Sequence, residues 1–149
     1  MIPRPLAPSD RRALALALAA IDPWATLGYG ALALEGYLGR DDPALARFVV
    51  EADGDIAAVI ALRSPWLRGP SIELLAVFPR HQGRGLGAAL LDWAADRAAG
   101  SANLWACVSA FNAGARRFYA AHGFAEAAAL ADLVAVGETE ILLRRRLKD

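Results

Sequence analysis

The spacing of apolar residues changes along the chain, from helical near the start to strand-like in the middle. A short strand is predicted at Ile2–Arg4, and a helix over 9–21 with Ser9 as its N-cap and Asp10 in its first turn. Its apolar face comprises Leu14, Leu18 and Ile21, and Asp22-Pro23 ends it. A second helix is predicted where apolar residues share one face, although glycines interrupt the pattern: Leu27, Ala31, Leu34 and Leu38.

Runs rich in β-branched and apolar residues then predict strands over 46–52, 55–63 and 71–78. Asp53-Gly54 is typical of a hairpin turn between the first two, and Pro79 stops the third. The remaining pattern predicts, in order, a helix over 85–99, a strand over 103–109, a helix over 112–122 ended by Gly123, and strands over 124–130 and 140–147. This order indicates a mixed α/β sheet of the α+β type rather than a doubly wound parallel one.

Composition narrows the class of protein. The 149 residues carry 16 basic and 16 acidic side chains, which argues against binding nucleic acid by neutralising phosphates. The apolar runs are too short to cross a bilayer. One cysteine excludes an internal disulfide, and no Cys/His cluster has zinc spacing, so we expect no metal. A single domain over 1–149, in the reducing cytoplasm, fits these features.

One segment near the start permits a second interpretation. Arg11-Arg12 followed by "ALALALAA" has the charged and apolar regions of an export signal. The same residues place their leucines on one helical face behind a capping residue. We therefore favour the helix.

Three glycines alternate in "QGRGLGA", directly after the strand that Pro79 ends. Gly83, Gly85 and Ala88 formally match the dinucleotide pattern G-x-G-x-x-G/A, but the next strand lacks the required acidic residue and the match lies too late in the chain. No G-K-[ST] follows, which excludes a Walker-type loop. A tight turn that needs small residues would explain the glycines alone. Bare amides at a helix N-terminus also favour an anion.

A second motif decides between these interpretations. "LAVFP" and "QGRGLG" are followed, about 25 residues later, by "NAGARRFYAAHGF". This combination resembles the GNAT superfamily of acyl-CoA-dependent N-acyltransferases, over about a third of the chain. The resemblance implies a sheet of about six to seven strands, splayed at its middle, with about four helices. It also implies acetyl-CoA as the donor.

The resemblance assigns the coenzyme A contacts. Backbone groups of Leu75, Ala76 and Val77, on a bulged strand, would pair with the pantetheine arm. The pyrophosphate would meet the loop and helix start, while Asn112 would cap its own helix and contact the cofactor. The loop residues concerned are Gln82, Gly83, Arg84, Gly85, Leu86, Gly87 and Ala88. Arg80 and His81 are more simply solvated turn residues.

Acetyl transfer to an amine needs a base and an acid. Glu73 interrupts an apolar strand and is the candidate base, although pairing with an arginine or exposure to solvent would explain it equally. Tyr119 fills the tyrosine position of the family, which implies proton donation to the departing sulfur. Phe118 is expected in the core instead. Cys107 stands where some relatives carry the base and is interpreted as a structural thiol.

The acceptor is the least determined part. Aromatic and charged residues could hold a cationic amine or belong to core and rim: Trp24, Tyr29, Glu35, Tyr37, Trp66 and Arg68. A small-molecule amine and a peptide or protein amine both stay open. The leading hypothesis is an N-acetyltransferase acting by direct transfer in a ternary complex. The alternatives are a non-catalytic acyl-CoA-binding module and another nucleotide binder. The resemblance makes a homodimer possible.

Overall fold

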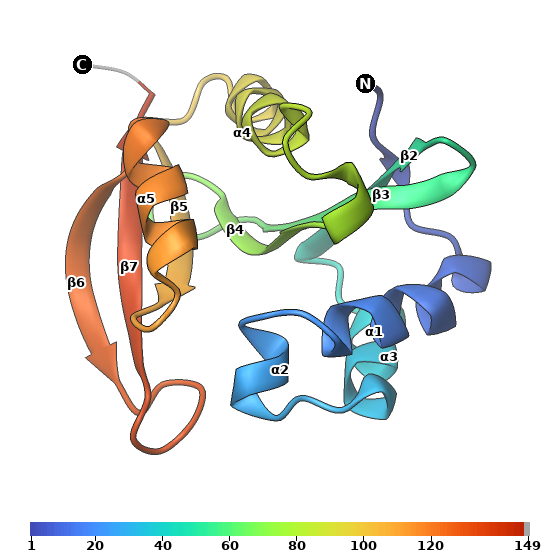
Figure 1. Cartoon of the computed structure of the whole chain (residues 1–149). Helices are drawn as coiled ribbons and strands as arrows, with labels where there is room; N and C mark the ends of the chain where they lie inside the picture. Colours follow the sequence, from blue (N-terminus) through green and yellow to red (C-terminus); the bar gives the residue numbers. More distant parts are fainter. Residues whose placement is uncertain (148–149) are drawn as a thin grey trace. The chain divides into compact units, whose positions relative to one another are not determined.

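The strands of the chain form a mixed sheet, seen in a computed structural model that describes residues 1–147 (Figure 1). Its seven strands follow the order β1-β2-β3-β4-β5-β7-β6. The strands are β1 (Arg4–Pro5), β2 (Leu45–Ala52), β3 (Asp55–Arg63), β4 (Ser71–Val77), β5 (Asn103–Ser109), β6 (Ala125–Ala131) and β7 (Thr139–Arg146). The helices are α1 (Arg11–Ala19), α2 (Trp24–Leu27), α3 (Ala31–Gly39), α4 (Leu86–Arg97) and α5 (Ala113–Ala121). The mixed α/β sheet predicted from the sequence is confirmed.

Chain contacts divide the protein into two compact units. The first comprises Met1–Ala61 and Leu74–Ala89, and the second comprises Leu62–Glu73 and the chain from Leu90 on. The boundary falls within β3, β4 and α4. A single domain over the whole chain stays a prediction.

The first unit buries the apolar faces of α1 and α3 against β2, β3 and the end of β4. Leu14, Leu18 and Leu38 are almost completely buried, together with Val49 and Val59. The hairpin between β2 and β3 turns at Asp53 (φ 55°) and Gly54 (φ 81°), two successive left-handed residues that match the right-handed twist of paired strands. The hairpin predicted from Asp53-Gly54 is confirmed.

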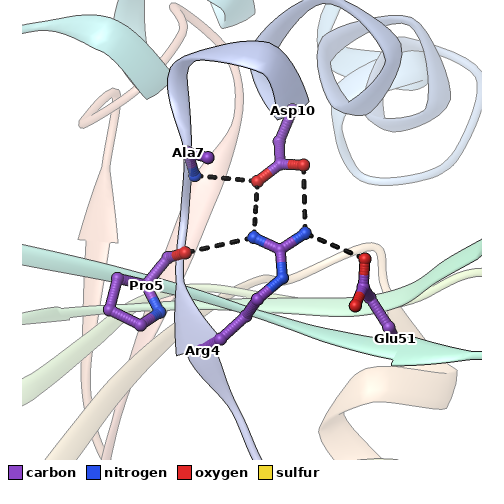
Figure 2. Close-up of polar contacts among 5 residues, drawn as sticks. All are labelled: Arg4, Pro5, Ala7, Asp10 and Glu51. Carbon is purple, nitrogen blue, oxygen red and sulfur yellow. Dashed lines mark hydrogen bonds and ion pairs between the residues drawn. The ribbon is translucent and has the colours of Figure 1, made fainter.

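The start of α1 differs from the expectation. Ser9 does not cap it: Pro8–Asp10 form a short 3-10 turn, and the Asp10 carboxylate accepts the Ala7 N–H at 2.7 Å. Asp10 also receives two hydrogen bonds from the Arg4 guanidinium, at 2.8 and 3.1 Å, and Arg4 reaches Glu51 at 3.1 Å (Figure 2). The first strand accordingly lies at Arg4–Pro5 rather than Ile2–Arg4.

From the ion pair between Arg4 and Asp10 we expect the stability of the protein to depend on pH. The Arg4 guanidinium lowers the pKa of Asp10, so its contribution is present above the ordinary value of about 3.9 and is lost as the pH falls through the lowered pKa. We expect Asp10→Asn to lower the Tm by a few degrees at pH 7 and to match the wild type near pH 2. Thermal unfolding at both pH values measures this, with the exposed Asp96→Asn as control. An equal deficit at both pH values would contradict it.

The predicted second helix is two helices. Gly28 adopts φ 78° and ends α2, and α3 begins at Ala31. Leu34 and Leu38 are buried on α3, whereas Leu27 is the last residue of α2. The helix α1 ends at Ala19, before the expected stop at Asp22-Pro23. Gly28, one of the glycines that interrupt the apolar pattern, therefore separates the two helices.

The second unit is built on antiparallel pairing of β7 with β5 and with β6. Asn112 caps α5 by accepting the Ala115 N–H at 3.2 Å, and Gly123 follows the helix at φ 88°, both as predicted. The parallel ladder between β4 and β5 pairs Ser71 with Trp105 and Ile72 with Ala106. These are two residues of each seven-residue strand, in line with the expected opening of the sheet.

Candidate functional site

The glycine loop connects β4 to α4 in the first unit. Gly83 and Gly85 adopt φ 76° and 79°, a left-handed backbone that L side chains rarely take. A Cβ at either position would meet no atom within 4 Å. Conformation rather than crowding therefore explains these two glycines.

The loop delivers unpaired amides at the start of α4. The helix begins at Leu86, and the Ala89 N–H donates to the Gly85 carbonyl at 3.0 Å. The amides of Leu86, Gly87 and Ala88 belong to the first turn and have no partner inside the helix. These donors and the helix dipole suit a phosphate group.

The polar side chains of this loop contact the protein itself. The Gln82 amide donates to the Val77 carbonyl at 2.9 Å. Arg84 pairs with Asp53 and Arg80 with Asp55, each at 2.6 Å, so the β2–β3 hairpin neutralises both. Arg84 lowers the pKa of Asp53. Direct contact of Gln82 and Arg84 with a pyrophosphate stays a prediction.

Burial corrects one expectation about the residues beside the loop and leaves another as a prediction. His81 is only 2% exposed, so it is not a solvated turn residue. The side chains of Leu74 and Ala76 on β4, and of Phe78 directly after it, are buried. The side chains of Leu75 and Val77 alternate with them and are half-buried. The bulge and the backbone pairing expected of Leu75–Val77 stay predictions.

Glu73 lies in the second unit as an ion-pair partner. The Arg63 guanidinium donates to both of its carboxylate oxygens, at 2.7 and 3.2 Å. The sequence left a base and an arginine partner open, and the structure shows the second. A base role for Glu73 would require this pair to open.

Tyr119 is the buried aromatic of α5. Its ring lies edge-on to Phe124 at 5.2 Å, and burial, followed by the neighbouring Cys107, raises its pKa well above the ordinary value. The hydroxyl therefore keeps its proton at neutral pH. The prediction that Phe118 occupies the core is wrong, because Phe118 is half-buried against His122 with ring centroids 4.7 Å apart. The His122 Nδ1 lies 2.8 Å from the Phe118 carbonyl.

Ser109 and Glu140 were not predicted from the sequence as candidate site residues. They lie opposite each other on β5 and β7, 1% and 7% exposed. Ser109 Oγ and Glu140 Oε2 have no hydrogen-bond partner among residues 1–147. Cys107 shares this face of β5; burial first, and then Glu140, raises the pKa of its thiol, consistent with a structural thiol rather than a nucleophile. Glu140 begins the run "EILL", and a charged residue at the start of a strand is ordinary, so the sequence carries no signal that it is buried.

The residues considered for the acceptor divide between the units. Trp24, Tyr29, Glu35 and Tyr37 belong to the first, and Trp66 and Arg68 to the second. Trp66 packs edge-on against Trp105 at 5.3 Å. It lines an open cleft of about 470 Å³ with Arg68 and Ser101.

Two classes of feature were searched for across residues 1–147. No group of His, Cys, Asp and Glu side chains in this part could hold a metal ion. None of its helices combines the length and apolar character that spanning a membrane requires.

Known proteins resemble the chain in sequence and fold. The model of the acetyltransferase (GNAT) family matches residues 13–124. Streptothricin acetyltransferase of Streptomyces lavendulae is 38% identical over 94 residues, 61% of this chain; the match spans about half (50%) of that relative. The crystal structure of nourseothricin acetyltransferase is 31% identical, with a TM-score of 0.64 over 72% of this chain and 68% of that one. Spermidine N-acetyltransferase from Vibrio cholerae, in complex with CoA and spermine, is 21% identical, with a TM-score of 0.73 over 98% and 95%.

Proposed function

The chain belongs to the acetyltransferase (GNAT) family, and from this premise we propose that it transfers the acetyl group of acetyl-CoA to a primary amine. Transfer is direct, with both substrates bound together, and Cys107 forms no covalent intermediate. The observation that carries the proposal is the glycine loop, which opens α4 with unpaired amides directly after the strand phrase "LAVFP".

The loop fits the charge of coenzyme A. Gly83, Gly85 and the first-turn amides of α4 would bind the pyrophosphate, which needs donors and little side-chain bulk. Arg84 would add a charge-assisted contact by exchanging Asp53 for a phosphate oxygen. Acetyl-CoA supplies the thioester that reacts; the chain supplies binding, orientation and proton transfer.

Gly85 tests this loop. We expect saturating acetyl-CoA, at 100 times its Kd, to stabilise the wild type by about 2.7 kcal/mol. Gly85→Val forces a branched side chain onto φ 79° and is expected to weaken binding by more than tenfold, which shrinks the thermal shift. Thermal unfolding with increasing acetyl-CoA measures it.

Gly28→Val is the matched control, because Gly28 has φ 78° and equally open surroundings but lies between α2 and α3. Both variants should lose similar stability without ligand, and only Gly85→Val should lose the response to acetyl-CoA. Stabilisation by NAD or ATP but not by acetyl-CoA would refute the donor.

Tyr119 is proposed as the acid that protonates the departing sulfur. Its raised pKa keeps the hydroxyl protonated at working pH, which an acid requires. Glu73 remains a candidate base only if Arg63 releases it.

The acceptor is proposed to be a primary amine of a small molecule. Two relatives above 30% identity are named for streptothricin and nourseothricin, so these are the first acceptors to test. Spermidine and a peptide N-terminus complete the panel. A homodimer and a cytoplasmic location stay predictions.

The alternative is a non-catalytic acyl-CoA-binding module, favoured by the ion pair that occupies Glu73. Turnover separates the two. Release of free thiol from acetyl-CoA, dependent on an amine of the panel, is expected for the enzyme; binding of acetyl-CoA without any release would favour the module.

A further inference from the structure

Two buried polar groups without partners lie side by side in the second unit. Ser109 and Glu140 are directly opposite each other in the antiparallel β5–β7 ladder, so their side chains project from the same face. Figure 1 shows these two strands adjacent, with α5 crossing in front of them. Neither Ser109 Oγ nor Glu140 Oε2 has a partner among the described residues. Buried polar atoms are rarely left in this state, which points to a ligand.

The chemistry of the pair defines what would satisfy it. An ionised carboxylate only accepts hydrogen bonds, and a serine hydroxyl accepts as well as donates. A primary ammonium carries a positive charge and three N–H donors, enough for both oxygens at once. An anion or an apolar group would leave the carboxylate unsatisfied.

The nearby cations of the protein are engaged elsewhere. On β7, Arg144 projects from the same face as Glu140 but lies four residues along the strand, about 13 Å away. Its guanidinium sits over the Trp105 ring, 5.8 Å from the centroid. The ion pairs of Arg116 and Arg145 go to Glu126 and Asp92. Within residues 1–147, arginine therefore pairs with Glu73 but not with Glu140.

The other titratable groups near this pair are neutral at pH 7. Cys107 projects from the same face of β5, two residues before Ser109, and Tyr119 approaches from α5. Burial raises the pKa of both, so neither brings a competing charge. Although its surroundings partly desolvate the thiol, Cys107 is exposed, so this face is open to a ligand beside the buried carboxylate.

We propose that Glu140, assisted by Ser109, binds the primary ammonium of the acceptor and acts as its general base. This rests on the proposed function and replaces Glu73 in it. An ammonium gives up two protons during acetyl transfer: Glu140 takes the first and passes it to solvent. As the C–N bond forms and the C–S bond breaks, the nitrogen loses the second proton. Tyr119 protonates the departing sulfur and is restored by that second proton, by way of solvent.

The base is tested with Glu140→Gln, which keeps the shape of the side chain and removes its basicity. We expect kcat with streptothricin or spermidine to fall about 100-fold at pH 7. The deficit should narrow to less than about tenfold at pH 9.5, because an amine with a pKa near 10.4 increasingly deprotonates by itself. A merely structural role would lower the rate equally at both pH values.

Glu138→Gln is the matched control, two residues earlier and outside β7. A second readout needs no turnover: spermidine added to the protein with coenzyme A should raise the Tm of the wild type and Glu138→Gln, but not of Glu140→Gln. Equal kinetics and equal shifts in the two variants would overturn the role of Glu140 while the proposed function stands. A wild type that transfers acetyl to no amine of the panel overturns the proposed function and this role with it.

Discussion

Replacing Tyr119 with phenylalanine is expected to lower kcat for acetyl transfer by about 100- to 1,000-fold. The variant removes one buried hydroxyl and keeps the ring that packs against Phe124. Without that proton the sulfur must leave as a thiolate, which raises the barrier of the step in which the C–S bond breaks. Acetyl-CoA binding should change little, because the glycine loop is untouched.

The pH profile of the wild type gives a second check on this residue. Since burial raises the pKa of Tyr119 above the ordinary value of about 10, the acid keeps its proton while amine acceptors lose theirs. The wild-type rate should therefore not decline on the alkaline side up to about pH 10. Assays of thiol release measure both the kcat of Tyr119→Phe and the pH dependence of the wild-type rate. A Tyr119→Phe protein with unchanged kcat would remove the residue from the chemistry.

Local structure was predictable because local physics decides it. The Asp53-Gly54 turn needs two left-handed residues, and Asn112 supplies the cap oxygen that an alanine could not. Alternating apolar residues placed the strands within a residue or two of their ends. The cap of the first helix was predicted wrongly because two residues compete there. Asp10 rather than Ser9 accepts a hydrogen bond, from the Ala7 N–H, because Arg4 holds the Asp10 carboxylate in place and Glu51 in turn binds Arg4.

Side-chain partners were not predictable, because they join strands distant in sequence. Arg63 and Glu73 stand ten residues apart, and Asp53 and Arg84 thirty-one. Their pairing decides whether a carboxylate or a guanidinium is available for chemistry. Glu73 looked unusual in its strand and is neutralised, whereas Glu140 looked ordinary, is buried, and leaves its Oε2 without a hydrogen-bond partner among residues 1–147.

This contrast changes where a base should be sought. An isolated charge within an apolar run signals a polar neighbour, but the neighbour can be the protein itself. Only the cross-strand register, which sets Ser109 opposite Glu140, reveals an unsatisfied pair. The motif residues led to the proposed binding site of the donor, and the cross-strand register led to the proposed binding site of the acceptor.

The substitution with the largest expected effect on stability is at Gly69, which lies two residues before β4 in the second unit. A Cβ there would overlap the Asn103 carbonyl oxygen and lie 2.8 Å from its carbonyl carbon. The backbone on both sides is fixed, because the Trp105 N–H donates to the Pro70 carbonyl at 3.0 Å and the Trp105 indole donates to the Leu67 carbonyl at 2.6 Å. Neither segment can move aside without breaking one of these bonds.

Gly69→Ala is therefore expected to cost about 3–4 kcal/mol of unfolding free energy and to lower the Tm by about 10 °C. Gly100→Ala is the matched control: Gly100 also has a positive φ, 96°, but a Cβ there meets no atom within 4 Å. Gly100→Ala should lower the free energy of unfolding by only about 1 kcal/mol, the cost of placing an alanine at a positive φ. Chemical denaturation of the two variants and the wild type separates the overlap from the conformation. Equal losses in the two variants would mean that the strands around Gly69 yield to the added methyl group.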